Sequence, residues 1–122
     1  MLLDSNIFIY AVLPQNDKLR NWLSKQDIAA SDITRLEVLG YHQLNESDLE
    51  LFQRLFAMCR IYPVTLSTIE SAIQLRRQKK MTLGDSIIAA TALENKESLA
   101  TRNAKDFAWI NGLKVIDPFT HV

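Results

Sequence analysis

Residues Met1 to Tyr10, MLLDSNIFIY, hold an apolar run, an acid and a helix start in close succession. Met1 to Leu3 is a short apolar run and predicts a buried strand. Asp4 follows at once, and Asn6 to Val12 predicts the beginning of a helix. This order places the Asp4 carboxylate at the carboxyl end of the first strand. In open α/β sheets that end of the strands is where ligands bind.

The rest of the chain repeats this alternation of strand and helix. Short apolar stretches predict further strands at Ile28 to Ala30, Ile61 to Val64, Ser98 to Ala100 and Lys114 to Ile116. Helical spacing of apolar residues predicts helices over Lys18 to Lys25, Ile33 to Leu44, Leu49 to Cys59, Ile69 to Arg77 and Asp85 to Asn95. We therefore expect an α/β fold, a three-layer α/β/α arrangement with a short central parallel sheet. Pro63 assigns its strand an edge position or an early end.

Bulk properties indicate one ordinary globular domain over residues 1–122, without repeat or linker. The net charge of +0 gives no support to nucleic-acid binding, but an acidic metal site can offset a basic face elsewhere. The single cysteine, Cys59, is expected as a buried free thiol in a reducing cytosol. No apolar run approaches the roughly 18 residues of a membrane span, and no signal peptide is evident, so we expect a cytoplasmic protein.

Acidic residues stand where the predicted architecture exposes them together. Asp4 follows the first strand, Glu37 lies early in the helix after the second, and Asp85 opens a later helix. Carboxylates are hard oxygen ligands that suit Mg²⁺ or Mn²⁺. A metal held in this way activates water and neutralises phosphate charge, which is the chemistry of phosphodiester hydrolysis.

Helix capping is the competing explanation for these acids. Thr34 to Glu37 matches the capping box, Thr82 to Asp85 is a looser version, and Ser47 to Glu50 and Ser67 to Glu70 match as well. Asp4 also suits the N-cap of the helix that follows it. Taken position by position, spacing leaves capping and catalysis both open.

Four segments, taken together, resemble the PIN-domain family: MLLDSNIFIY (1–10), ITRLEVLG (33–40), LGDSIIAATA (83–92) and TRNAKDF (101–107). They stand in the order of that family's motifs and span almost the whole chain. The resemblance implies a PIN-like fold and a metal-dependent endoribonuclease of the kind found as VapC-type toxins in bacterial type II toxin–antitoxin pairs. It also implies an RNA substrate, Mg²⁺ or Mn²⁺ as cofactor, a cognate antitoxin as partner, and a homodimer.

Carried over residue by residue, the resemblance makes Asp4, Glu37 and Asp85 the metal-binding catalytic acids. The family's fourth acidic position falls on Asn103, which coordinates through its carbonyl oxygen but adds no charge. Asp106, one helical turn further on, is the other candidate for that catalytic position. This departure puts a second metal in doubt more than the first.

Further candidates support the site or bind RNA. Asn6 and Thr101 resemble family residues that hydrogen-bond within the acidic site. Arg102 and Lys105 lie inside the last motif, where they are placed to meet a phosphate. Arg76 and Arg77 begin the densest basic run, Arg76 to Lys80, which is either a solvated helix end or an RNA-backbone contact.

Other classes fit the residues less well. A receiver-type signalling domain needs an acidic pair after the first strand, and a haloacid-dehalogenase-type phosphatase needs Asp-x-Asp there, but Ser5 and Asn6 follow Asp4. His42 and His121 form no HExxH motif, and no serine has a G-x-S-x-G context, which argues against a zinc enzyme or serine hydrolase. A catalytically inactive PIN fold used for protein binding remains an alternative, with Asn103 as its one indication.

Overall fold

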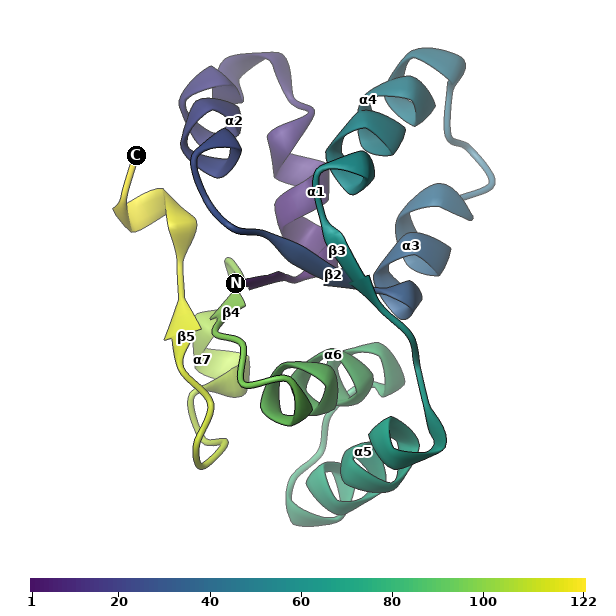
Figure 1. The fold of residues 1–122 in the computed structure, drawn as a ribbon, viewed down its shortest axis with the longest axis vertical. Helices are drawn as coiled ribbons and strands as arrows, with labels where there is room; N and C mark the ends of the chain where they lie inside the picture. The colour runs from purple at the N-terminus through teal and green to yellow at the C-terminus, as the bar shows by residue number, and fades with distance from the viewer.

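The computed structural model describes residues 1–122 and contains one five-stranded sheet in the order β3-β2-β1-β4-β5 (Figure 1). The strands are β1 (Leu2–Leu3), β2 (Ala29–Ser31), β3 (Arg60–Tyr62), β4 (Leu99–Ala100) and β5 (Val115–Ile116). Every neighbouring pair is parallel. The predicted α/β fold with a short central parallel sheet is confirmed.

Helices cover the sheet on both sides. They are α1 (Ser5–Ala11), α2 (Asp17–Ser24), α3 (Asp32–Leu39), α4 (Glu46–Ala57), α5 (Leu66–Gln78), α6 (Leu83–Glu94) and α7 (Ala104–Phe107), with 3-10 turns η1 (Pro14–Asn16) and η2 (Pro118–Thr120). Figure 1 shows α1, α2 and α4 on one side of the sheet and α5, α6 and α7 on the other. None of these helices combines the length and the apolar character that crossing a bilayer requires.

Strand residues divide the core into two clusters because successive side chains point to opposite faces. Leu3 packs with α1 and α4, where the Phe8 ring stacks on Phe56 at 4.3 Å between centroids. Leu2 packs on the other face with α5, α6 and α7. Both faces of the central strand are thus buried, as its continuous apolar run predicts.

The predicted helix from Ile33 to Leu44 is too long, because α3 ends at Leu39. Edge placement of the third strand is confirmed, since β3 is an edge strand and ends before Pro63. Cys59 is a free thiol as expected, but it is half-buried rather than buried.

Most of the predicted capping boxes lie a few residues away from the true helix starts. Ser31 caps α3, Asn45 caps α4, and Thr65 caps α5 in a box with Thr68. Thr82 does cap α6 as predicted, accepting from the backbone N–H of Asp85. The boxes predicted at Thr34, Ser47 and Ser67 are therefore wrong.

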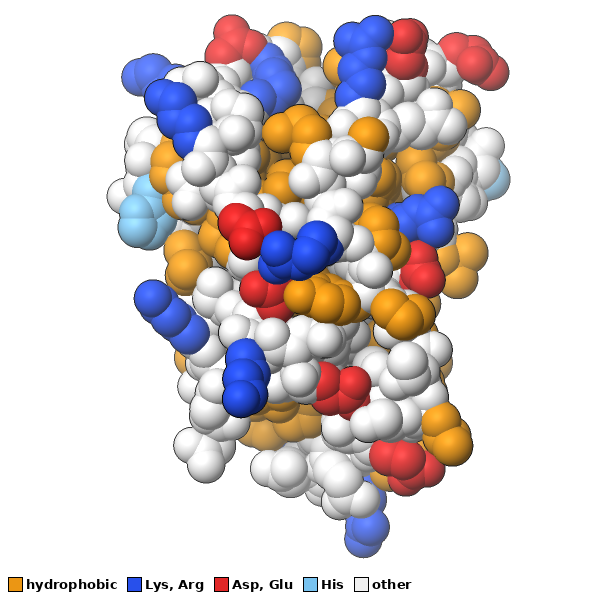
Figure 2. Space-filling model, viewed as in Figure 1, with side chains coloured by type: hydrophobic (Ala, Val, Ile, Leu, Met, Phe, Trp, Pro, Cys, Tyr) orange, Lys and Arg blue, Asp and Glu red, His pale blue; other side chains and the backbone are white.

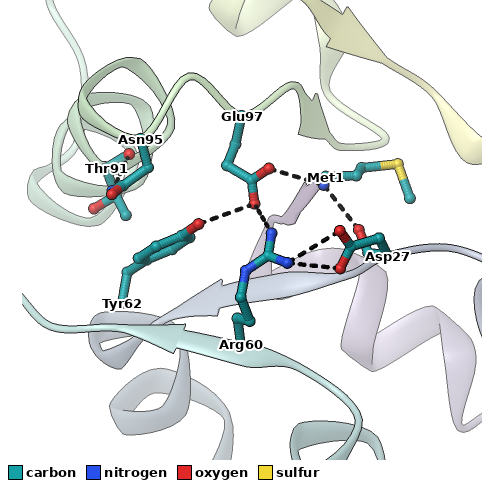
Figure 3. A network of polar contacts seen from close by, with 7 residues as sticks. All are labelled: Met1, Asp27, Arg60, Tyr62, Thr91, Asn95 and Glu97. Atoms are coloured by element: carbon teal, nitrogen blue, oxygen red, sulfur yellow. Dashed lines mark hydrogen bonds and ion pairs between the residues drawn. The ribbon is translucent and has the colours of Figure 1, made fainter.

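A polar network ties together the amino-terminal ends of the strands (Figure 3). The Arg60 guanidinium pairs with Asp27 at 2.8 Å and with Glu97 at 3.0 Å. Glu97 also accepts from the Met1 amino group at 3.2 Å and from the Tyr62 hydroxyl at 3.4 Å. These contacts hold together the end of the sheet that lies opposite the carboxyl ends of the strands.

On the face drawn in Figure 2, acidic and basic side chains are interspersed, in keeping with the zero net charge.

Candidate active site

Asp4 is buried at the carboxyl end of β1, with only 5% of its surface exposed. Its Oδ1 accepts from the backbone N–H of Ser5 at 2.8 Å, so it caps α1. Its Oδ2 accepts from the Thr101 hydroxyl at 2.7 Å. One carboxylate oxygen of Asp4 therefore caps α1, and the other is oriented by Thr101, which follows β4.

Electrostatics link Asp4 to the other predicted acids. The pKa of Asp4 is raised from 3.8 to about 6, mainly because the carboxyl is buried. The negative charges of Asp85 and Glu37 contribute to this rise, and hydrogen bonds from Thr101 and Ser5 oppose it. Charge interaction of this kind requires proximity. Asp85 and Glu37 are thus both within electrostatic reach of Asp4.

Glu37 extends from α3 toward the beginning of α6. The Ser5 hydroxyl donates to its Oε1 at 3.0 Å. A Cβ placed on Gly84 would lie 3.2 and 3.3 Å from the two Glu37 oxygens, so the carboxylate lies close against the Gly84 backbone. Glu37 is in the interior of α3, six residues after the cap at Ser31, and the capping-box explanation of Glu37 is wrong.

Asp85 follows Gly84 in the first turn of α6. Its backbone N–H donates to the Thr82 hydroxyl at 3.1 Å, and this bond satisfies the cap without the Asp85 carboxylate. Partial burial raises the pKa of that carboxyl, and the charge of Asp106 raises it further, while the Thr82 side chain lowers it. The charge of Asp85 therefore interacts with that of Asp4 and with that of Asp106.

The last motif reaches the site mainly through Thr101. Besides donating to Asp4, its hydroxyl accepts from the Asn6 side chain at 3.4 Å and from the backbone N–H of Asn103 at 3.0 Å. Thr101 thus joins Asn6 and Asp4 in one hydrogen-bonded group. The Asn103 side chain is exposed and makes no hydrogen bond, and it forms no cap for α7.

The donor chemistry of this cluster fits a hard divalent cation. Asp4, Glu37 and Asp85 offer oxygen atoms only, which suits Mg²⁺ or Mn²⁺. None of the three forms an ion pair within the chain. No group of three acids, histidines or cysteines is gathered closely enough to enclose a metal. The carboxylates repel one another, and a bound cation would remove that repulsion.

The basic candidates divide into two groups. Arg76 and Lys105 line a pocket of about 470 Å³ that also contains Asp85. Arg77 lines the adjoining groove between α5 and α6, where Arg76 lies as well. Arg102 lies 4.2 Å from the Phe119 ring centroid and pairs with Asp117 at 3.2 Å. Arg76 and Lys105 thus share a pocket with Asp85, Arg77 lies outside that pocket, and Arg102 is engaged with Asp117 and Phe119.

Sequence reasoning missed the roles of Ser5 and Gly84. Ser5 stands out in the sequence only as a non-acidic residue after Asp4, and its contact to Glu37 joins segments 32 positions apart. Gly84 carried a signal, because glycine is unfavourable inside a helix and often marks a close approach. The neighbour that approaches it, Glu37, emerges only in the fold.

Comparison with known proteins gives one matching family and many similar structures. A family model described as PIN domain matches residues 1–112. A search of curated proteins found no match. A chain of a toxin–antitoxin complex from Klebsiella pneumoniae is 29% identical, with a TM-score of 0.77 and 96% of each chain covered.

Two further structures extend this likeness. A chain of FitAcB from Neisseria gonorrhoeae is 26% identical, with a TM-score of 0.77 and 97% of each chain covered. A chain of DNA-bound VapBC from Salmonella typhimurium has a TM-score of 0.83 over 96% of each chain at 19% identity. The last likeness concerns the fold alone.

Proposed function

The chain belongs to the PIN-domain family, and we propose that it is a metal-dependent endoribonuclease, the toxin of a toxin–antitoxin pair. The observation that carries this proposal is the buried Asp4 carboxylate, whose pKa is raised in part by the charges of Asp85 and Glu37. Carboxylates that raise one another's pKa are a feature of functional sites, where a bound cation would neutralise their charge. PIN domains are typically metal-dependent nucleases, which sets the class of chemistry.

In this proposal Asp4, Glu37 and Asp85 hold Mg²⁺ or Mn²⁺. When bound, the metal supplies an activated water and neutralises charge on the scissile phosphate. Thr101 orients Asp4 through its 2.7 Å hydrogen bond, and Ser5 orients Glu37 at 3.0 Å. Hydrogen bonds of this type fix the direction in which a ligand oxygen points.

Asn103 and Asp106 divide the role of the family's fourth acidic position between them. Asp106 is close enough to Asp85 for its charge to raise the Asp85 pKa. The Asn103 side chain has no hydrogen-bond partner within the chain and is free to hold a water. We assign Asp106 the electrostatic part of the role and Asn103 the positioning of water.

An antitoxin and a second copy of this chain are the proposed partners. Similar chains at 26 to 29% identity support this, and one of them comes from a toxin–antitoxin complex. Large apolar side chains are exposed along the groove between α5 and α6, among them Ile69 and Ile73 on α5 and Leu83 on α6. Contiguous exposed apolar surface marks protein interfaces. We assign this surface to the homodimer.

The test is cleavage of single-stranded RNA by the purified protein. Cleavage should stop in EDTA, return with Mn²⁺ or Mg²⁺, and be absent in Asp4→Asn at every metal concentration. Cleavage that survives exhaustive chelation would reject the metal mechanism. A protein that cleaves nothing under any of these conditions, yet binds a partner, would instead support the inactive PIN fold.

A further inference from the structure

We propose that a basic pocket beside the acids binds the RNA phosphate adjacent to the scissile one, so that the strand runs past Asp85 and over the turn between α5 and α6. This inference rests on the proposed ribonuclease function. We define the basic pocket as the cavity of about 470 Å³ whose charged lining is Arg76, Lys79, Lys80, Lys105, Asp85 and Asp106.

The pocket has a net positive charge, although it adjoins the acidic candidate site. Four of its charged side chains are cations and two are acids, and only Met81 contributes an apolar side chain. Asp85 lines the pocket and also interacts through its charge with Asp4, so the pocket and the acidic site adjoin at Asp85. A strand whose scissile phosphate lies at the metal needs cations for the next phosphate, since Asp106 alone would repel it.

The pocket's cations are not used to neutralise carboxylates within the chain. Five of the seven arginines, namely Arg20, Arg35, Arg54, Arg60 and Arg102, form ion pairs. Arg76 and Arg77, at the end of α5, are the two that form none. Asp85 and Asp106 are unpaired too, although Lys105 and Arg76 line the same cavity. Several unpaired cations that line one cavity suit an external anion.

Two contacts brace the turn that contributes to the pocket. The Arg76 Nε donates to the Met81 carbonyl at 3.2 Å and so fixes the turn between α5 and α6. The Lys79 ammonium lies 5.7 Å from the Trp109 ring centroid, which ties that turn to the region after α7. Lys80 and Lys105 are exposed and make no hydrogen bond or ion pair. These two lysines, one from the turn after α5 and one from α7, are therefore free to follow a phosphate.

The experiment compares two charge-matched double variants. Lys80→Gln/Lys105→Gln removes the free cations of the pocket, and Lys18→Gln/Lys25→Gln removes two exposed, unpaired lysines at α2. Binding of a fluorescent single-stranded RNA is measured in EDTA at several salt concentrations, followed by cleavage with Mn²⁺. Melting temperatures verify that all proteins fold. A second RNA series carries one neutral methylphosphonate at a time around the cleavage site.

We expect the pocket variant to bind about 10-fold more weakly, with a salt slope reduced by about 0.7 for each phosphate that the variant no longer neutralises. The α2 variant should bind like wild type. One methylphosphonate next to the cleaved linkage should weaken wild-type binding but not binding by the pocket variant. Equal binding by both variants, with wild type cleaving normally, overturns the pocket and leaves the nuclease standing. A wild type that neither binds nor cleaves RNA overturns both.

Discussion

The Thr101 hydroxyl donates a 2.7 Å hydrogen bond to Oδ2 of Asp4, joining residues 97 positions apart. Both residues follow neighbouring strands, since β1 and β4 pair in parallel register. Thr101 is fully buried, so no water replaces it as a donor. The orientation of the most buried acid in the cluster thus depends on the last motif of the chain.

Thr101→Val should impair activity more than stability. The isosteric side chain removes the donor to Asp4 and the acceptor for Asn6 and Asn103. We expect a loss of about 10- to 100-fold in metal affinity or activity, as for other residues that orient a metal ligand. The unfolding free energy should fall by about 1–3 kcal/mol. Mn²⁺ titration of cleavage and chemical denaturation measure the two effects.

Thr91→Val is the matched control for Thr101→Val. Thr91 is also buried, but its hydroxyl donates to the Ile87 carbonyl within α6. It should lose some stability and keep the wild-type dependence of cleavage on Mn²⁺. Equal cleavage by the two variants would show that Thr101 does not position Asp4.

The metal-free protein should become more stable as the pH falls from 7.5 to about 5. The folded-state pKa of Asp4 is raised from 3.8 to about 6, so the fold disfavours its charged form. The resulting destabilisation is fully present above pH 6 and disappears as the pH falls toward 4; by linkage it amounts to about 3 kcal/mol. Denaturation in EDTA across this range should show the trend in wild type and a much flatter one in Asp4→Asn.

Glu37→Gln should abolish most RNA cleavage and leave stability nearly unchanged. Glu37 caps no helix, and its carboxylate lies between Ser5 and the Gly84 backbone. The amide keeps the shape but is a poorer ligand for a hard cation. Glu70→Gln, at an exposed and unpaired acid on α5, serves as control. Wild-type cleavage by Glu37→Gln would remove Glu37 from the metal site.

Ile73→Lys should convert a dimer into a monomer in light-scattering measurements. Ile73 is 44% exposed in the groove between α5 and α6, where a charge would have to be buried by the second copy. Met58→Lys, at a residue 49% exposed beyond α4, should leave the dimer intact. A monomeric wild type, or an unchanged mass for Ile73→Lys, would rule out this surface as the interface.

The layered α/β fold could be predicted from the sequence, because burial on both faces of a parallel sheet demands apolar strands and amphipathic helices in alternation. Local spacing misplaced the caps at Thr34, Ser47 and Ser67, because several hydroxyl residues stand near each helix start. The backbone conformation selects Ser31, Asn45 and Thr65 instead.

The contacts among the candidate residues could not be predicted from the sequence and depend on the tertiary structure. Glu37 meets Ser5 and Gly84, and Asp4 meets Thr101, through contacts between segments that no local pattern connects. The basic candidates were separated in the same way, since Lys105 lines a pocket with Asp85 while Arg102 lies against Phe119. The spacing of apolar residues indicates which face of a helix or strand is buried. Contact between two polar side chains depends instead on how whole helices and strands pack together.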